Sequence, residues 1–395
     1  MRYTLGEKEK GTKEPKKSSN VLWGRRKQVS TVSGLVSLLF VLFGQLYVLF
    51  AQICMSHFGG SLQDGSRKLV EVWPMAFYND YLPGITLGPV LGYAGWIAFQ
   101  GLLYWVLPGR IAYSPPTPGG NILPYRMNGL LSFSLTIAVV AVAAACNGAK
   151  LIAGLAENWT SFLVVANVYG LLVALLAQIK GYTMPTCEKD RRMSGSLIHD
   201  FMAGVELNPR LGSSWDLKLF HIGRLAMNAW IVIDISFMAQ QYRQFGSVSN
   251  SIIIVTILHS IYVVDFFYNE EWYLATIDMA HDHFGFYLGW GSAVWLPVIY
   301  TSQAQYLSSH FVHLSPFACG AILTTGILGY ILFRLANFQK DILRRTQGKC
   351  QIFGSKPRVV QAQYTTADGK VHQSLLLRSG MSYSYRKCAY GKTDC

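Results

Sequence analysis

The chain has little charge for its length. Only 14% of its 395 residues are Asp, Glu, Lys or Arg, whereas soluble domains carry about 25%. A shortage of this size, with 51% hydrophobic residues, argues against an ordinary water-soluble domain and indicates lipid as the main solvent. The remaining charge is one-sided, with a formal net value of +13. Because the positive residues lie between and outside the apolar runs, we expect them to face anionic lipid or a phosphorylated ligand and not nucleic acid.

Three motifs are also missing. No Cys-x-x-Cys pair occurs among the seven irregularly spaced cysteines, so neither a zinc site of the usual spacing nor a disulfide framework has support. No Gly-x-Gly-x-x-Gly follows a predicted strand, which excludes a Rossmann dinucleotide site. No cleavage pattern of small residues closely follows the first apolar run, so we expect that run to remain as a signal anchor.

Long apolar runs are what the sequence does contain. A membrane helix needs about 20 mostly apolar residues, and eight runs approach that length. They lie near residues 31–54, 84–107, 129–149, 159–179, 225–241, 250–267, 284–307 and 315–336. Lys and Arg gather before the first run, after the fourth and after the eighth, so the positive-inside rule places both termini in the cytosol. The predicted fold class is an all-α polytopic membrane protein with about eight transmembrane helices.

Four regions follow from this pattern. They are a basic cytosolic arm over 1–30, a membrane domain over 31–337, a cytosolic segment over 338–378 and an atypical tail over 379–395 that we expect to be disordered. In the third region, residues 359–366 and 370–377 predict two strands around an Asp-Gly turn, which would form a short cytosolic β-hairpin.

A dense charged stretch precedes the fifth apolar run. It comprises Gly204 to Arg210, Asp216 to Phe220, and Gly223-Arg224. One interpretation is a solvated loop with internal ion pairs. The other is a wall of a ligand cavity on the cytosolic side.

A second cluster, from Tyr262 to Trp290, places carboxylates and histidines between or within apolar runs. Charged groups at membrane depth are costly and therefore need partners or a function. Tyr262 and Asp265 are three residues apart and would share a helix face. A tyrosine backed by a carboxylate can supply a proton to an apolar substrate. His281 and Asp282 would open the helix expected over 284–307, where a carboxylate suits the helix dipole.

Two other interpretations of this cluster stay open. His281, Asp282 and His283 could bind a metal together with Glu270, although this spacing matches no helical metal motif. The aromatic and polar residues could also simply anchor the helices at the membrane surface.

A third cluster, from Arg334 to Arg345, follows the eighth run. Lys340 and Arg344 are four residues apart and would lie on one helical face. Two fixed cations could hold a diphosphate or a 2′-phosphate. They could equally belong to the positive belt at the cytosolic surface.

The amino-acid sequence of these clusters resembles the sterol reductase family over roughly residues 180–378. The matching stretches are 204–210 with 219–220 and 223–224, 262–274, 278–285 with 289–291, and 333–350. The resemblance implies an enzyme of the endoplasmic reticulum membrane that uses NADPH to reduce a sterol ring double bond. A proton adds to one alkene carbon and hydride to the other, in a water-poor cavity that tolerates positive charge.

Within the family, the His-Asp-His-Phe-Gly stretch and the Asp-Gly hairpin are more similar to the Δ7 branch than to the Δ14 branch. The expected reaction is therefore reduction of the C7=C8 bond of ring B, which converts 7-dehydrocholesterol to cholesterol, with Δ14 reduction as the alternative. The resemblance implies cofactor contacts at Lys340, Arg344 and Leu377, to which we add Arg334 and Asn337. It implies a catalytic tyrosine at Tyr262, for which Asp265 and Asp282 are the hypothesised partners, and it implies no metal.

The resemblance ends near Ser379-Gly380, where the family continues with two further membrane helices and a basic terminal segment. Arg386, Cys388 and Tyr390-Gly391 match that terminal segment only faintly. From this departure we expect the chain alone to be weakly active or inactive. Two alternatives to an enzyme remain: a non-catalytic sterol-binding or scaffold protein of the same fold, and an eight-span transporter or receptor. The expected partners are sterol, membrane lipid and, by family analogy, other enzymes of sterol biosynthesis.

Overall fold

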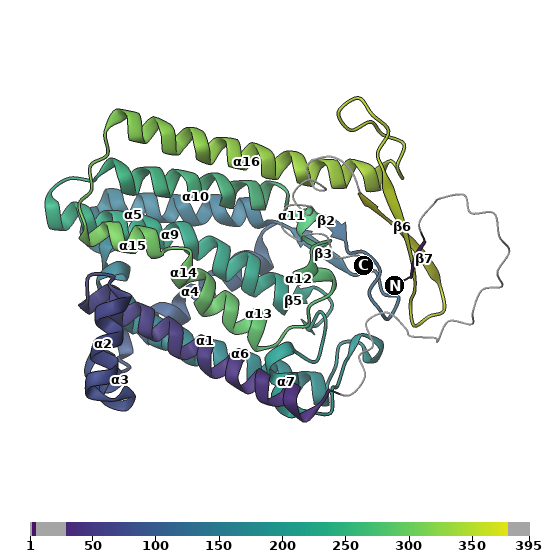
Figure 1. The fold of residues 1–395 in the computed structure, drawn as a ribbon, viewed down its shortest axis with the longest axis horizontal. Helices are drawn as coiled ribbons and strands as arrows, with labels where there is room; N and C mark the ends of the chain where they lie inside the picture. The colour runs from purple at the N-terminus through teal and green to yellow at the C-terminus, as the bar shows by residue number, and fades with distance from the viewer. Residues whose placement is uncertain (1, 5–28, 378–395) are drawn as a thin grey trace. The chain divides into compact units, whose positions relative to one another are not determined.

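The computed structural model describes residues 2–4 and 29–377 (Figure 1). The tail over 379–395 and most of the basic arm over 1–30, for which we made predictions above, lie outside this part. The described chain forms two compact units. We call residues 26–115 and 123–319 the helical unit, and residues 1–25, 116–122 and 320–395 the hairpin unit.

Six helical stretches in the described residues are long and apolar enough to cross a membrane, which confirms the polytopic membrane protein. They are α1 (Thr31–His57), α5 (Gly129–Glu157), α6 (Trp159–Thr183), the stretch Leu217–Phe245, α10 (Asn250–Tyr268) and α16 (Pro316–Arg345). The stretch Leu217–Phe245 comprises α8 (Leu217–Leu219), the π-helical turn η2 (Phe220–Ala226) and α9 (Met227–Phe245).

The other two expected spans differ from the prediction. Helix α4 (Leu87–Val106) has the length to cross a membrane but is not among those six. The prediction of a single helix over 284–307 is wrong, because the structure has several shorter helical pieces there. The pieces are α13 (Phe286–Trp290), the π-helical turn η3 (Gly291–Trp295), α14 (Leu296–Ile299) and α15 (Ser302–Ser309).

The division of this helix has a local cause. Pro297 has no N–H with which to bond the carbonyl one turn earlier, and such a gap disturbs the helical ladder. The Thr301 hydroxyl then donates to the Pro297 carbonyl oxygen at 2.5 Å, where a continuous helix would use a backbone N–H. The helix stops there and restarts as α15.

The helical unit also contains short elements that connect the spans. The helices are α2 (Leu62–Val72), α3 (Pro74–Tyr81), η1 (Glu188–Asp190), α7 (Leu197–Ala203), α11 (Glu270–Tyr273) and α12 (Ile277–Ala280). Strands β2 (Arg110–Tyr113) and β3 (Pro124–Met127) pair antiparallel, as do β4 (Arg210–Leu211) and β5 (Trp215–Asp216).

The core of the helical unit lies where α1, α6, α9 and α13 meet. Val48, Leu163, Phe237 and Trp290 are buried together there. Helix α6 approaches α13 closely at Gly170, where a Cβ atom would lie 2.9 Å from Trp290 Cδ1. A small residue is therefore needed at this position for the two helices to pack, as is common between membrane helices.

The hairpin unit contains the predicted β-hairpin, which is confirmed. Strands β6 (Val359–Thr365) and β7 (Val371–Leu377) pair antiparallel, and β1 (Arg2–Thr4) pairs with the other edge of β6. Gly369 takes the positive φ of 83° that the turn requires. The Ala367 N–H donates to the Pro118 carbonyl oxygen at 2.8 Å, which ties the turn to residues 116–122. Residues 320–345 of α16 belong to the same unit.

Candidate functional site

The segment of residues 204–210 and the loop of residues 278–285 pack backbone to backbone. The Phe284 N–H donates to the Glu206 carbonyl oxygen at 2.9 Å. Gly204, at a φ of 86°, and Gly285 approach so closely that a Cβ on Gly285 would lie 2.4 Å from the Gly204 nitrogen. Both glycines are therefore required, the first for its conformation as well as its size. The loop that carries Asp282 is fixed by this contact.

The Lys218 side chain binds backbone carbonyls of the loop of residues 278–285. Its fully buried ammonium donates to the carbonyl oxygens of Asp278 at 2.7 Å, Met279 at 3.2 Å and Asp282 at 2.7 Å. Asn208 adds a bond from its amide to the Met279 carbonyl at 3.3 Å. An ammonium has three donors, and here all three are used.

The interpretation of the first charged cluster as a solvated loop is wrong. Glu206, Arg210 and Asp216 are buried. Glu206 pairs with Lys180 at 2.7 Å, and Arg210 Nε lies 3.5 Å from Asp216 Oδ2. The charged residues form a buried support under the loop of residues 278–285.

Tyrosines and carboxylates converge beside this loop. Tyr262 on α10 interacts electrostatically with Asp265 and Asp278, and Tyr273 on α11 interacts with Tyr262, Asp278 and Asp282. The Tyr273 hydroxyl donates to Asp278 Oδ2 at 3.1 Å. Burial, and then the Asp278 carboxylate, raises the pKa of Tyr273 well above its ordinary value, so this phenol keeps its proton at neutral pH. We call these five residues the tyrosine–carboxylate cluster.

The cluster brings together the three predicted catalytic residues. Asp265 is nine-tenths buried and accepts a bond from Asn269 Nδ2 at 3.1 Å. We had expected Asp282 to open a helix, and this prediction is wrong. His281 ends α12, where its N–H donates to the Ile277 carbonyl, and the next helix begins only at Phe286. Burial lowers the pKa of His281, against the opposing effect of Asp282.

A buried Asp–His pair next to Tyr262 escaped the sequence reasoning. Asp234 of α9 lies wholly buried, with Oδ2 at 2.7 Å from Nδ1 of His259 on α10. The Trp230 ring lies against the rings of Tyr262, at 5.6 Å, and Tyr300, at 4.9 Å. A signal for the pair existed, since Asp234 is an isolated acid inside an apolar run.

A second buried pair was also missed. Arg224 Nη1 lies 2.5 Å from Glu270 Oε1, and neither side chain is exposed beyond a few per cent. Glu270 also accepts the Gly129 N–H at 3.0 Å, and Asn128 Oδ1 accepts from Arg224 at 2.8 Å. Glu270, which we had considered as a metal ligand, is thus part of an ion pair. Within residues 2–4 and 29–377, no group of three or more His, Cys, Asp or Glu side chains is placed to hold a metal ion.

The five predicted cofactor residues all lie in the hairpin unit. Arg334, Asn337, Lys340 and Arg344 are on α16, so the expected helical spacing of the two cations is confirmed. Leu377 is the last residue of β7. The tyrosine–carboxylate cluster lies in the helical unit.

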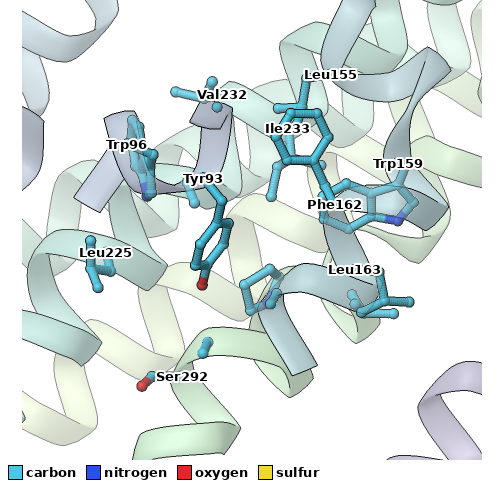
Figure 2. Close-up of a pocket in the computed structure, with 16 residues that line it drawn as sticks. Tyr93, Trp96, Leu155, Trp159, Phe162, Leu163, Leu225, Val232, Ile233 and Ser292 are labelled. Carbon is cyan, nitrogen blue, oxygen red and sulfur yellow. The ribbon is translucent and has the colours of Figure 1, made fainter. Parts of the chain in front are cut away.

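An apolar cavity of about 210 Å³ lies inside the helical unit (Figure 2). Residues of α4, α5, α6, η2, α9, η3 and α14 line it. Four aromatic rings contribute to its wall, Tyr93 and Trp96 from α4 and Trp159 and Phe162 from α6, and most of the other lining residues are aliphatic. No Asp, Glu, Lys or Arg is among its lining residues. Sequence reasoning did not find this cavity, because its wall is built from ordinary apolar helix positions.

Comparison with known proteins decides the family. The sequence pattern of the Ergosterol biosynthesis ERG4/ERG24 family matches residues 71–391. The chain belongs to this sterol reductase family. The match includes residues beyond Ser379-Gly380, where we had expected the resemblance to end. That departure therefore no longer argues for a weakly active or inactive chain.

The relatives include reductases of two kinds. The chain is 39% identical over 377 residues to the 7-dehydrocholesterol reductase of Xenopus laevis, covering 91% of this chain and 78% of the relative. It is 38% identical over 386 residues to the 7-dehydrocholesterol reductase of Danio rerio, covering 93% and 79%. It is also 34% identical over 333 residues to the Delta(14)-sterol reductase of Methylotuvimicrobium alcaliphilum, covering 84% and 74%. The sterol reductase resemblance is therefore confirmed, and the choice of double bond stays a proposal.

Proposed function

We propose that this sterol reductase uses NADPH to reduce the C7=C8 bond of ring B and so converts 7-dehydrocholesterol to cholesterol. The tyrosine–carboxylate cluster carries the proposal. It offers a proton-bearing phenol beside several carboxylates, in a family whose members reduce sterols. Higher identity to the 7-dehydrocholesterol reductases supports Δ7 over Δ14.

In the proposed mechanism, Tyr262 donates its phenolic proton to one alkene carbon of the sterol. Its partners Asp265 and Asp282, together with Asp278, then face the positive charge that develops on the neighbouring carbon, which negative groups in a water-poor site stabilise. Tyr273, bonded to Asp278, keeps that carboxylate oriented. Solvent returns the proton to Tyr262 after each turnover.

The residues on α16 fit a phosphorylated nicotinamide cofactor. Lys340 and Arg344 are one helical turn apart, so both cations could contact the same diphosphate or 2′-phosphate, and a guanidinium can bind two phosphate oxygens at once. Arg334, Asn337 and Leu377 would complete the contacts. NADPH, when bound, would supply the hydride that joins the cationic carbon, and it would leave as NADP⁺.

The membrane location belongs to the proposal as well. The sterol reductase relatives support a location in the endoplasmic reticulum membrane. The distribution of Lys and Arg supports an orientation with both termini in the cytosol. The Δ14 reaction is the second candidate, on the strength of the Methylotuvimicrobium relative.

The first experiment expresses the chain in membranes that lack both reductases. Each sterol, the Δ5,7-diene and the Δ14-ene, is supplied with NADPH, and products are identified by mass spectrometry. Tyr262→Phe removes the donated proton and should lower kcat at least about 100-fold, the usual size of a general-acid effect. Tyr268→Phe is the matched control, because Tyr268 lies on the same helix but is 78% exposed. Equal rates for both variants would refute Tyr262 as the donor.

The cofactor segment has its own test. Lys340→Ala and Arg344→Ala should each raise KM for NADPH by about 10- to 100-fold, the size expected for one charge-assisted bond. Lys349→Ala, which removes the same charge beyond the end of α16, is the control. Unchanged KM values would assign both cations to the membrane surface instead.

A further inference from the structure

Helix α9 presents different residues to the apolar cavity and to Tyr262. Ala229, Val232 and Ile233 line the cavity, three positions that share one face of a helix. Trp230 points elsewhere and contacts the Tyr262 ring. None of the five residues of the tyrosine–carboxylate cluster lines the cavity, so the cavity is distinct from that cluster.

The shape and chemistry of the wall select a rigid apolar ligand. Figure 2 shows the rings of Tyr93, Trp96, Phe162 and Trp159 around the space. The wall carries no charged side chain, and Ser292 already donates its hydroxyl to the Gly289 carbonyl at 3.0 Å. Such a wall suits a fused-ring hydrocarbon body and rejects a charged headgroup.

A polar cavity of about 530 Å³ adjoins the apolar one, and Trp159 lines both. The polar cavity lies where α1, α9 and α15 end and α6 begins. In its wall, the Gln305 amide donates to Gln52 Oε1 at 3.1 Å, and Gln52 donates to the Thr160 hydroxyl at 3.0 Å. The two cavities together offer an apolar space that ends in a hydrogen-bonding space.

One donor at the junction lacks an acceptor. In the part of the chain that the structure describes, the Trp159 indole N–H is buried and has no hydrogen-bond partner. Its ring packs edge-on against Phe237, which lines the polar cavity. Figure 2 shows the indole nitrogen on the edge far from Tyr93. Buried N–H groups are nearly always paired, so this one points to a missing ligand oxygen.

We propose that the two cavities form a second sterol site, separate from the site of reduction. The fused rings would occupy the apolar cavity. The hydroxyl oxygen would accept the Trp159 N–H and reach the polar cavity. The site does not depend on the proposed reaction, because none of its lining residues belongs to the tyrosine–carboxylate cluster.

Photolabelling of the purified full chain in phospholipid nanodiscs tests the location. A cholesterol analogue with a diazirine on its ring system is the probe, and labelled peptides are mapped by mass spectrometry. We expect labels on α4 and α6, near Trp96 and Phe162, that unlabelled cholesterol competes away. Ala229→Phe, which fills the cavity, should remove these labels, and Ala144→Phe, at an exposed position of α5, should not. Labels that spread evenly over lipid-facing residues, or that survive Ala229→Phe, would overturn the proposal.

The orientation of the bound sterol is tested with a sterol that lacks the hydroxyl group. Cholesterol should bind about 5-fold more tightly than cholest-5-ene, which lacks the oxygen, as expected for one hydrogen bond. Trp159→Phe should abolish this preference while keeping the ring contact with Phe237, and Tyr93→Phe should keep the preference. Sterol reduction is measured in parallel. Because Trp159→Phe leaves Tyr262 intact, a failure of the second sterol site can be distinguished from a failure of the proposed reaction. A preference that persists in Trp159→Phe would refute the assigned hydroxyl position.

Discussion

The ion pair between Arg224 and Glu270 should govern the stability of the helical unit. Arg224 is completely buried in the stretch Leu217–Phe245, and Glu270 follows α10. Replacing Glu270 by Leu leaves the guanidinium without its counter-charge, because Asn128, which accepts its other hydrogen bonds, is neutral. We therefore compare Glu270→Leu, Arg224→Met and the double variant.

The magnitude follows from what each change leaves unpaired. Either single variant strands one buried charge, at a cost of about 3–5 kcal/mol. The double variant strands no charge, only the Gly129 N–H and the Asn128 side-chain oxygen. At about 1–2 kcal/mol for each orphaned neutral group, it should lose about 2–4 kcal/mol. The double variant should thus be no less stable than either single one.

Thermal unfolding of the purified chain in nanodiscs measures these differences. A single variant should lower Tm by roughly 5–10 °C, taking about 2 °C per kcal/mol for a large domain. Glu71→Gln is the control, because its pair with Lys68 is exposed and should contribute no more than about 1 kcal/mol. If the two single effects simply add in the double variant, the pair is not coupled and the reasoning fails.

Three further predictions concern the loop and the hairpin. Lys218→Met removes the donors that bind the carbonyls of Asp278, Met279 and Asp282, so the rate of sterol reduction should fall at least about 10-fold. The control Lys68→Met should leave the rate unchanged. A fully active Lys218→Met variant would show that the loop keeps its conformation without these bonds. Gly285→Ala would place a Cβ 2.4 Å from the Gly204 nitrogen, so amide exchange in the loop should accelerate at least about 10-fold while exchange in α1 stays the same. The Asp368 carboxyl should titrate with a pKa of about 2, chiefly because the Thr366 hydroxyl donates to it; carbon NMR of labelled aspartate should show this, and Thr366→Val should raise the value.

The elements that sequence patterns predicted well are those set by local rules. Length and hydropathy identified α1 and α10, and an Asp-Gly turn between alternating residues identified the β6–β7 hairpin. The break in the helix expected over 284–307 depends on how Pro297 and Thr301 complete their hydrogen bonds. Periodicity does not contain that information, so an apolar run was taken for one helix.

In the candidate site, too, the features set by local spacing could be predicted, and those that depend on contacts between helices could not. Tyr262 and Asp265 could be found together because they lie one turn apart on a single helix. The pairing of Arg224 with Glu270, and of Asp234 with His259, joins residues from different helices. Partners of this kind depend on helix packing, which spacing along the chain does not report. The cavity was missed for a further reason, since its aromatic wall has the composition of any membrane core.

We propose that this chain adds a hydride from NADPH and a proton from a solvent-exchanging tyrosine across a sterol double bond. Isotope labelling of the product tests it most directly. The chain, in membranes without other sterol reductases, receives 7-dehydrocholesterol with NADPH that carries two deuterium atoms at C4 of the nicotinamide, in ordinary water; a parallel reaction uses unlabelled NADPH in D₂O. We expect cholesterol with one deuterium from each reaction, and the carbon labelled by NADPH should be adjacent to the carbon labelled by D₂O. Absence of product, or deuterium from only one of the two sources, would contradict it.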